Sequence, residues 1–187
     1  MLFPGYDARK AAQVGAFFAL KEGGKINILK VAKLLYLAER ESMAQYDEPM
    51  FYDKLVSMPQ GPVTSITLNL INGEVSDPSW GDLLSRDDNH TVHVASECKF
   101  ENLDRLSRSD LRILEELWQR FGHMTGYQLR DWTHDPKNVP EWQDPLGSSL
   151  AISHVKVFSA LNKANSAELS KDINEYREIA KQFEAAE

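Results

Sequence analysis

The sequence predicts a mostly α-helical protein. We expect a single compact domain of about six to seven helices over residues 1–187, with a small β-hairpin or short strands in the middle. Apolar residues recur at helical spacing in most segments, and a stretch rich in Asp, Ser, Asn and Gly at residues 74–97 interrupts them. The 187 residues are 42% hydrophobic and 26% charged, which is typical of a globular protein with a sizeable core.

The first two helices have clear sequence signals. Asp7 is a favourable N-cap for the first helix, and Gly23 and Gly24 end it. A second helix is expected from about residue 27 to 45, because apolar side chains recur there on one face. This stripe consists of Ile28, Val31, Leu34, Leu35 and Ala38.

The opposite face of the second helix carries Leu29, Lys33, Tyr36 and Arg40 at helical spacing. Two interpretations fit this mixed face. It is a solvated face with snorkelling Tyr and Lys stems, or it is a contact surface for a partner, because Tyr and Arg are frequent interface anchors. Trp80, in the polar middle region, either closes a loop or anchors a partner. Lys33, Tyr36, Arg40 and Trp80 are therefore the candidate partner-binding residues.

Short strands are expected around the third helix. The apolar residues 55–58 suit an edge strand, and Gly61 and Pro62 are expected to open a helix, with proline near its first turn. Residues 91–94 alternate between polar and apolar side chains, which predicts one strand of a hairpin. The segment 74–97 thus separates an N-terminal helical half from a C-terminal one.

The C-terminal half is expected to contain four helices. Ser107 and Asp110 form a capping box for the first, which ends at Gly122, and Thr125 caps a short second helix. Prolines follow, and then two helices at about residues 153–162 and 166–185. The last of these is expected to extend the domain over residues 166–187. Its amphipathic stripe consists of Leu169, Ile173, Tyr176, Ala180 and Phe183.

Composition limits the possible functions. The net charge of −7 and the pI of about 5.3 argue against direct nucleic-acid binding or attachment to an anionic membrane, because both need a basic surface. Cys98 is the only cysteine, so an internal disulfide is impossible and a reducing compartment is favoured. No segment reaches the about 18 apolar residues that a membrane span needs. We expect a cytoplasmic protein with no membrane partner.

Sequence motifs for catalysis or cofactor binding are absent. His90 and His93 are three residues apart in an expected strand or turn, where they point to opposite faces, so no metal site and no cofactor are expected. His134 and Asp131 are the pair most compatible with acid–base chemistry. The alternative is that Thr133 and His134 finish a helix and tie its last carbonyls to the next loop, with the helix dipole favouring the histidine.

Three motifs together resemble a known family. Residues 30–38 resemble the K-x-x-K-L-L-Y-x-A helix of the Panacea domain, the SocA-like antitoxin family. Residues 58–63 are similar to its G-P-V turn, and residues 129–134 resemble its L-x-x-x-T-H motif, followed at a suitable distance by Trp142. The resemblance extends from about residue 8 to 161. It implies structural roles for Gly61, Pro62, Thr133, His134 and Trp142.

The resemblance also implies a function. Panacea proteins are mostly helical, are not known as enzymes, and in many cases neutralise a co-encoded toxin by direct binding. We therefore expect an antitoxin whose partner is a cognate toxin, and the acidic chain suits a basic toxin. Some relatives deliver a toxin to a cytosolic AAA+ protease, and others occur in mobile elements or phages, which suggests phage defence. A proteolytic adaptor and an enzyme using His134 and Asp131 remain as alternatives.

Overall fold

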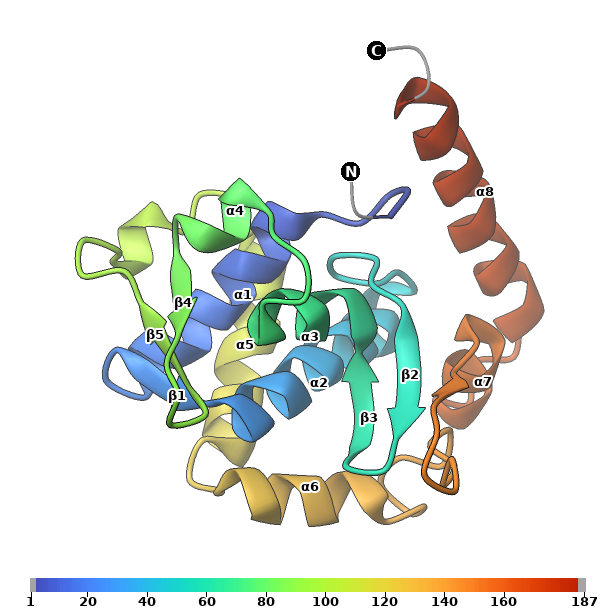
Figure 1. Cartoon of the computed structure of the whole chain (residues 1–187). Helices are drawn as coiled ribbons and strands as arrows, with labels where there is room; N and C mark the ends of the chain where they lie inside the picture. Colours follow the sequence, from blue (N-terminus) through green and yellow to red (C-terminus); the bar gives the residue numbers. More distant parts are fainter. Residues whose placement is uncertain (1–2, 185–187) are drawn as a thin grey trace.

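Helix α2 passes through the centre of the computed structural model, which describes residues 3–184 (Figure 1). The other elements pack around this helix, and its Leu34, Leu35 and Tyr36 are fully buried. The elements are, in chain order, α1 (Ala8–Lys21), β1 (Lys25–Asn27), α2 (Ile28–Tyr46), β2 (Leu55–Met58), β3 (Gly61–Thr64), α3 (Ser65–Asn72), α4 (Pro78–Gly81), β4 (Leu84–Arg86), β5 (Thr91–Val94), the 3-10 helix η1 (Phe100–Asn102), α5 (Arg108–Phe121), α6 (Gly126–His134), β6 (Leu150–Ala151), α7 (His154–Ala160) and α8 (Ser166–Glu184).

The mostly helical fold is confirmed, with one helix more than expected. Among the described residues there are eight α-helices, because the four-residue α4 lies within the region expected to be loop and hairpin. Its signal is local: the side chain of Asp77 caps Ser79, and Pro78 occupies the first turn. No helix of residues 3–184 is both long and apolar enough to cross a membrane.

The predicted helix starts are confirmed where the cap is local. The carboxylate of Asp7 accepts a hydrogen bond from the backbone N–H of Lys10 at 2.9 Å, at the start of α1. Ser107 and Asp110 form the predicted capping box of α5, and Thr125 caps α6 in the same way. In each case the side chain satisfies an N–H group that the first helical turn leaves without a partner.

Two small antiparallel sheets flank α2. Strands β1, β5 and β4 form one sheet in that order, and the β4–β5 pair is the predicted hairpin. Strands β3, β2 and β6 form the other. The prediction of a strand at residues 55–58 is confirmed, but its placement at the edge of a sheet is wrong. β2 is a central strand, because the two-residue β6 from the C-terminal half pairs with it. The other neighbour in this sheet is β3.

Gly61 and Pro62 do not open a helix, which corrects the sequence prediction. They are the first two residues of β3, and Gly61 lies opposite Met58 across a tight turn. Proline is tolerated there because β3 is an edge strand, where its missing N–H leaves no ladder bond unmade. The helix begins only at Ser65, because its free N–H groups are capped from a distance: the carboxylate of Asp53 accepts hydrogen bonds from the amides of Ile66 and Thr67, both at 2.9 Å.

Helix α8 begins on the domain and then leaves it (Figure 1). In its first half, Ser170 and Ile173 are buried against the domain. Arg177 ends this contact by donating hydrogen bonds to the backbone carbonyls of Tyr52 and Asp53, at 3.2 and 3.0 Å. The expected final residue of this helix, Ala185, lies outside the described residues.

Candidate functional site

The three family-like motifs meet around the turn between β2 and β3. Helix α2 brings Lys33 to this turn from one side, and α6 brings Thr133 and His134 from another. The loop after α6 adds Trp142. Residues that are more than 100 positions apart in the chain thus form one group, which we call the motif cluster: Lys33, Gly61, Pro62, Thr133, His134 and Trp142.

The motif cluster holds the backbone of the turn in place. Three side chains of the cluster carry N–H donors, and each donates a hydrogen bond to a different backbone carbonyl of residues 58–62. These bonds run from Trp142 Nε1 to Met58 O (3.2 Å), from His134 Nε2 to Pro59 O (3.2 Å) and from Lys33 Nζ to Pro62 O (2.9 Å). A turn whose carbonyls are satisfied from two helices and a loop is a rigid part of the surface.

Gly61 is required at its position for two reasons. Its φ of +97° lies in the region that favours glycine. A Cβ atom there would also lie only 3.0 Å from both Lys33 Nζ and Thr133 Oγ1. The Thr133 hydroxyl cannot easily turn away, since it donates to the carbonyl of Arg130 at 2.8 Å in the last turn of α6. The glycine therefore lets α2, α6 and the turn approach one another closely.

Lys33 is fully buried in the motif cluster, and no carboxylate of residues 3–184 forms an ion pair with it. Burial, together with the nearby guanidinium of Arg130, lowers the pKa of its amine from 10.5 to about 7. Folding therefore releases a proton from Lys33 between about pH 7 and 10.5. The cost is largest below pH 7 and disappears as the pH approaches 10.5.

We expect the substitution Lys33→Met to change how stability depends on pH. The wild-type free energy of unfolding gains about 2 kcal/mol from Lys33 between pH 7 and pH 9, and the variant lacks this gain. Urea denaturation of both proteins at the two pH values measures the difference. All other titrating groups are shared, so they cancel. An equal change with pH in both proteins would show that Lys33 keeps its proton on folding.

Tyr36 and Arg40 hold an internal carboxylate. The Tyr36 hydroxyl donates to Glu141 Oε1 at 2.7 Å, and Arg40 Nε donates to the same oxygen at 2.6 Å. The side chain of Glu141 is fully buried, so the Arg40 guanidinium compensates its charge. Burial, and then the Glu141 charge, raise the pKa of Tyr36. The interaction ties the loop after α6 to the middle of α2.

The face of α2 that was expected to contact solvent or a partner is covered, which corrects the sequence interpretation. Lys33 and Tyr36 are fully buried, and Arg40 is largely buried. Trp80, which belongs to α4, is buried in the core against α1. The reason is that α2 is central: α6 and residues 139–142 pack on the side opposite the apolar stripe. In this conformation, Lys33 is the one of these four residues that lines an apolar surface groove.

That groove lies next to the motif cluster. It has a volume of about 410 Å³ and is bounded by the first half of α2, the β2–β3 turn and the start of α6. Tyr127 stands at its margin and is 67% exposed. No acidic side chain of the described residues lines it. The lining residues are Asn27, Ile28, Leu29, Ala32, Lys33, Met58, Pro59, Gln60, Val63, Leu68, His90 and Tyr127.

The polar residues considered for catalysis or metal binding have other partners. Asp131 pairs with the neighbouring Arg130 at 2.6 Å. No hydrogen bond within residues 3–184 joins it to His134, whose ring packs edge-on against Trp142. His93 bonds to Asp87 in the hairpin. In the described part of the chain, no group of three His, Cys, Asp or Glu side chains could hold a metal ion.

Two features of this site were missed from the sequence. Glu141 was not recognised, because Arg40 requires an acidic partner only when it is buried, and the sequence does not show that it is. Its only local signal is its place before Trp142. Tyr127 was placed on a short helix, but nothing in the sequence shows that α2 and the β2–β3 turn leave a groove beside it.

Fold and site together define a mostly helical domain with an apolar groove beside a hydrogen-bonded turn. The chain belongs to the family of SocA-like antitoxins with a Panacea domain, whose family model matches residues 31–143. The match includes the second and third motifs and all of the first except Lys30, and it covers more than half of the chain. The comparisons with curated proteins and with solved structures gave no match.

Proposed function

We propose that the protein is an antitoxin that neutralises a co-encoded toxin in the cytoplasm by binding it directly, and that the apolar groove receives an apolar segment of the toxin. The observation that supports this most is the position of the groove. It lies beside the motif cluster, and nine of its twelve lining residues fall within the part of the chain that matches the antitoxin family. Membership of such a family favours binding over catalysis.

The groove has the properties of a contact site. Its lining is apolar, so a partner segment that enters it gains the free energy of burying hydrophobic surface. The exposed ring of Tyr127 can supply an anchor at the margin, as tyrosines often do at interfaces. Three hydrogen bonds already hold the β2–β3 turn, so little ordering entropy is lost on binding.

We expect a charge in the groove, or loss of the tyrosine ring at its margin, to abolish neutralisation. Leu29→Glu and Tyr127→Ala are tested in cells that express the protein encoded beside this chain. The matched control is Leu146→Glu, since Leu146 is 90% exposed and does not line the groove. Wild type and the control should restore growth, whereas the groove variants should not. Neutralisation by both groove variants at normal protein levels would contradict the groove, and absence of any toxicity or rescue would contradict the antitoxin function.

A proteolytic adaptor is the second candidate function. An adaptor needs a second surface for an AAA+ protease, and the exposed outer half of α8 offers one. The half-life of the toxin with and without the antitoxin separates the two functions. Simple neutralisation leaves the half-life unchanged or lengthens it, while an adaptor shortens it. Unaltered neutralisation by a folded His134→Ala variant would also dispose of an enzymatic mechanism that uses His134.

A further inference from the structure

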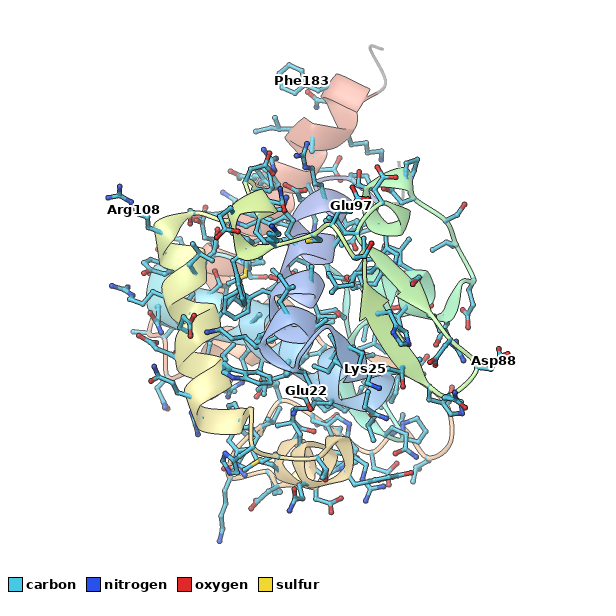
Figure 2. All side chains as sticks on the ribbon, turned by 90° about the vertical axis from the view of Figure 1, so that its left-hand side faces the viewer. Glu22, Lys25, Asp88, Glu97, Arg108 and Phe183 are labelled. Carbon is cyan, nitrogen blue, oxygen red and sulfur yellow. The ribbon has the colours of Figure 1, made fainter. Side chains whose placement is uncertain are left out.

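Helix α8 is attached to the domain by its inner half. Ser170 and Ile173 are buried there, and the Arg177 guanidinium donates hydrogen bonds to the backbone carbonyls of residues 52 and 53. Beyond Arg177 the helix leaves the domain, and Figure 2 shows Phe183 at its far end, away from the body of the protein. The attachment of this 19-residue helix therefore depends on a short stretch, residues 170–177.

A buried histidine lies at this attachment. His154 is the first residue of α7, which packs along α8, and it is 8% exposed. Within the described part of the chain, its Nε2 atom has no hydrogen-bond partner, and neither has the buried Nε atom of Arg177. Buried nitrogens without a partner reduce the free energy gained from a contact. The α7–α8 junction is thus less stable than a contact in which every buried polar atom is bonded.

Positive charge is unfavourable at His154. Burial, and then the charge of the Arg177 guanidinium, lower the pKa of the histidine ring from 6.5 to about 4. At neutral pH the docked ring is therefore uncharged. A protonated His154 would add a second positive charge close to that of Arg177, in a buried site where water screens it little.

Acidic groups compensate the charge of Arg177, and they lose their own charge on acidification. Burial lowers the pKa of Arg177, and Glu39 on α2, followed by Asp53 and Tyr52 before β2, oppose this shift. Burial raises the pKa of Glu39 to about 7 and also raises that of Asp53. As the pH falls below 7, the attraction that holds Arg177 weakens. This change and the protonation of His154 both act against docking of α8.

We propose that the α7–α8 junction is an acid-sensitive switch, in which protonation of His154 releases α8 from the domain. Release exposes the inner face of the helix, including Ile173, and so uncovers a new apolar contact surface. His154 and Arg177 lie outside residues 31–143, and neither lines the apolar groove. The switch therefore does not depend on the proposed toxin contact.

The direction of the switch follows from the proton on His154. In the released state the ring is solvated and takes up its proton below its ordinary pKa of 6.5, whereas the docked ring does so only near pH 4. Docking is thus strongest above pH 6.5 and weakens as the pH falls toward 4. Between pH 7.5 and pH 5, the two pKa values predict a shift of about thirtyfold toward release.

Hydrogen exchange of the full chain at pH 7.5 and pH 5, followed by mass spectrometry, tests the switch. Each observed rate is divided by the intrinsic amide rate at the same pH, so that protection reports the opening equilibrium. A single helix of 19 residues is marginally stable in water, so release removes protection from residues 170–177. Their protection should fall about thirtyfold at pH 5, while that of α2 should change little.

Two variants assign this fall to His154. His154→Leu and the larger His154→Phe do not titrate, so the protection of residues 170–177 should fall much less than in wild type. The matched control is His123→Leu, which removes an exposed histidine between α5 and α6 and should keep the wild-type fall. Constant protection in wild type would overturn the proposal, as would an equal fall in both His154 variants. A fall of the same size in α2 would overturn it as well, because the whole domain would then be unfolding.

Discussion

The substitution Glu39→Ala is expected to lower the free energy of unfolding by about 3–5 kcal/mol, which is a large fraction of the about 5–15 kcal/mol that stabilises an ordinary protein. Glu39 is fully buried in α2, and its carboxylate accepts three backbone hydrogen bonds. These come from the N–H groups of Met50 (2.5 Å), Phe51 (3.1 Å) and Asp53 (2.7 Å). Alanine leaves all three donors buried and unsatisfied. Urea denaturation at pH 7 measures the loss.

Glu39→Gln is the control for this prediction, because its amide oxygen can still accept from part of the loop. A smaller loss than for alanine is expected. Burial raises the pKa of Glu39 from 4.5 to about 7 in spite of the three donors. The stability it contributes is therefore full below pH 4.5 and is lost as the pH rises through 7. Glutamine does not titrate, so its stability relative to wild type should rise across this window. Equal stability of the alanine variant and wild type would contradict the role of Glu39.

The substitution Gly61→Ala is expected to lower the free energy of unfolding by about 2–4 kcal/mol, from backbone strain and close contacts together. The strain follows from its φ of +97°, and the contacts from Lys33 Nζ and Thr133 Oγ1 at 3.0 Å from the added methyl group. Because the turn forms part of the groove, neutralisation of the toxin should weaken as well. Thermal melting and the growth assay measure the two effects.

Gly147→Ala is the matched control for Gly61→Ala. Gly147 has a similar φ of +88°, but a Cβ atom there would meet nothing within 4 Å. It should show the backbone strain alone, about 1 kcal/mol, and leave neutralisation intact. The difference between the two variants is then the contribution of close packing in the motif cluster. Equal losses would mean that the motif cluster yields to the extra methyl group.

The parts of the fold that the sequence predicts are those with local causes. The starts of α1, α5 and α6 follow from Asp7, Ser107 and Thr125, each of which caps an N–H within three residues. The start of α3 was misplaced because its cap, Asp53, lies 13 residues before Ile66. No local pattern carries that information.

Sequence-based prediction has the same limit for the site, because contacts between distant segments leave no local pattern. The motif residues could be named from the resemblance, but not the contacts that bring them to one turn. The amphipathic pattern of α2 shows which side is apolar. It does not show that α6 and Glu141 cover the other side and bury Lys33 and Tyr36. A central helix is packed all round, so its polar residues resemble a solvated face until their partners are known. The groove depends on three separate segments and has no sequence signature.

The central claim is that the toxin binds directly at the apolar groove beside the motif cluster, and calorimetry tests this claim most directly. The purified protein encoded beside this chain is titrated with wild type, Leu29→Glu and the control Leu146→Glu. We expect a tight complex with wild type and with the control, and affinity reduced at least a hundredfold, about 2.7 kcal/mol, for Leu29→Glu. Equal affinity of all three proteins for the toxin would contradict the groove as its binding site.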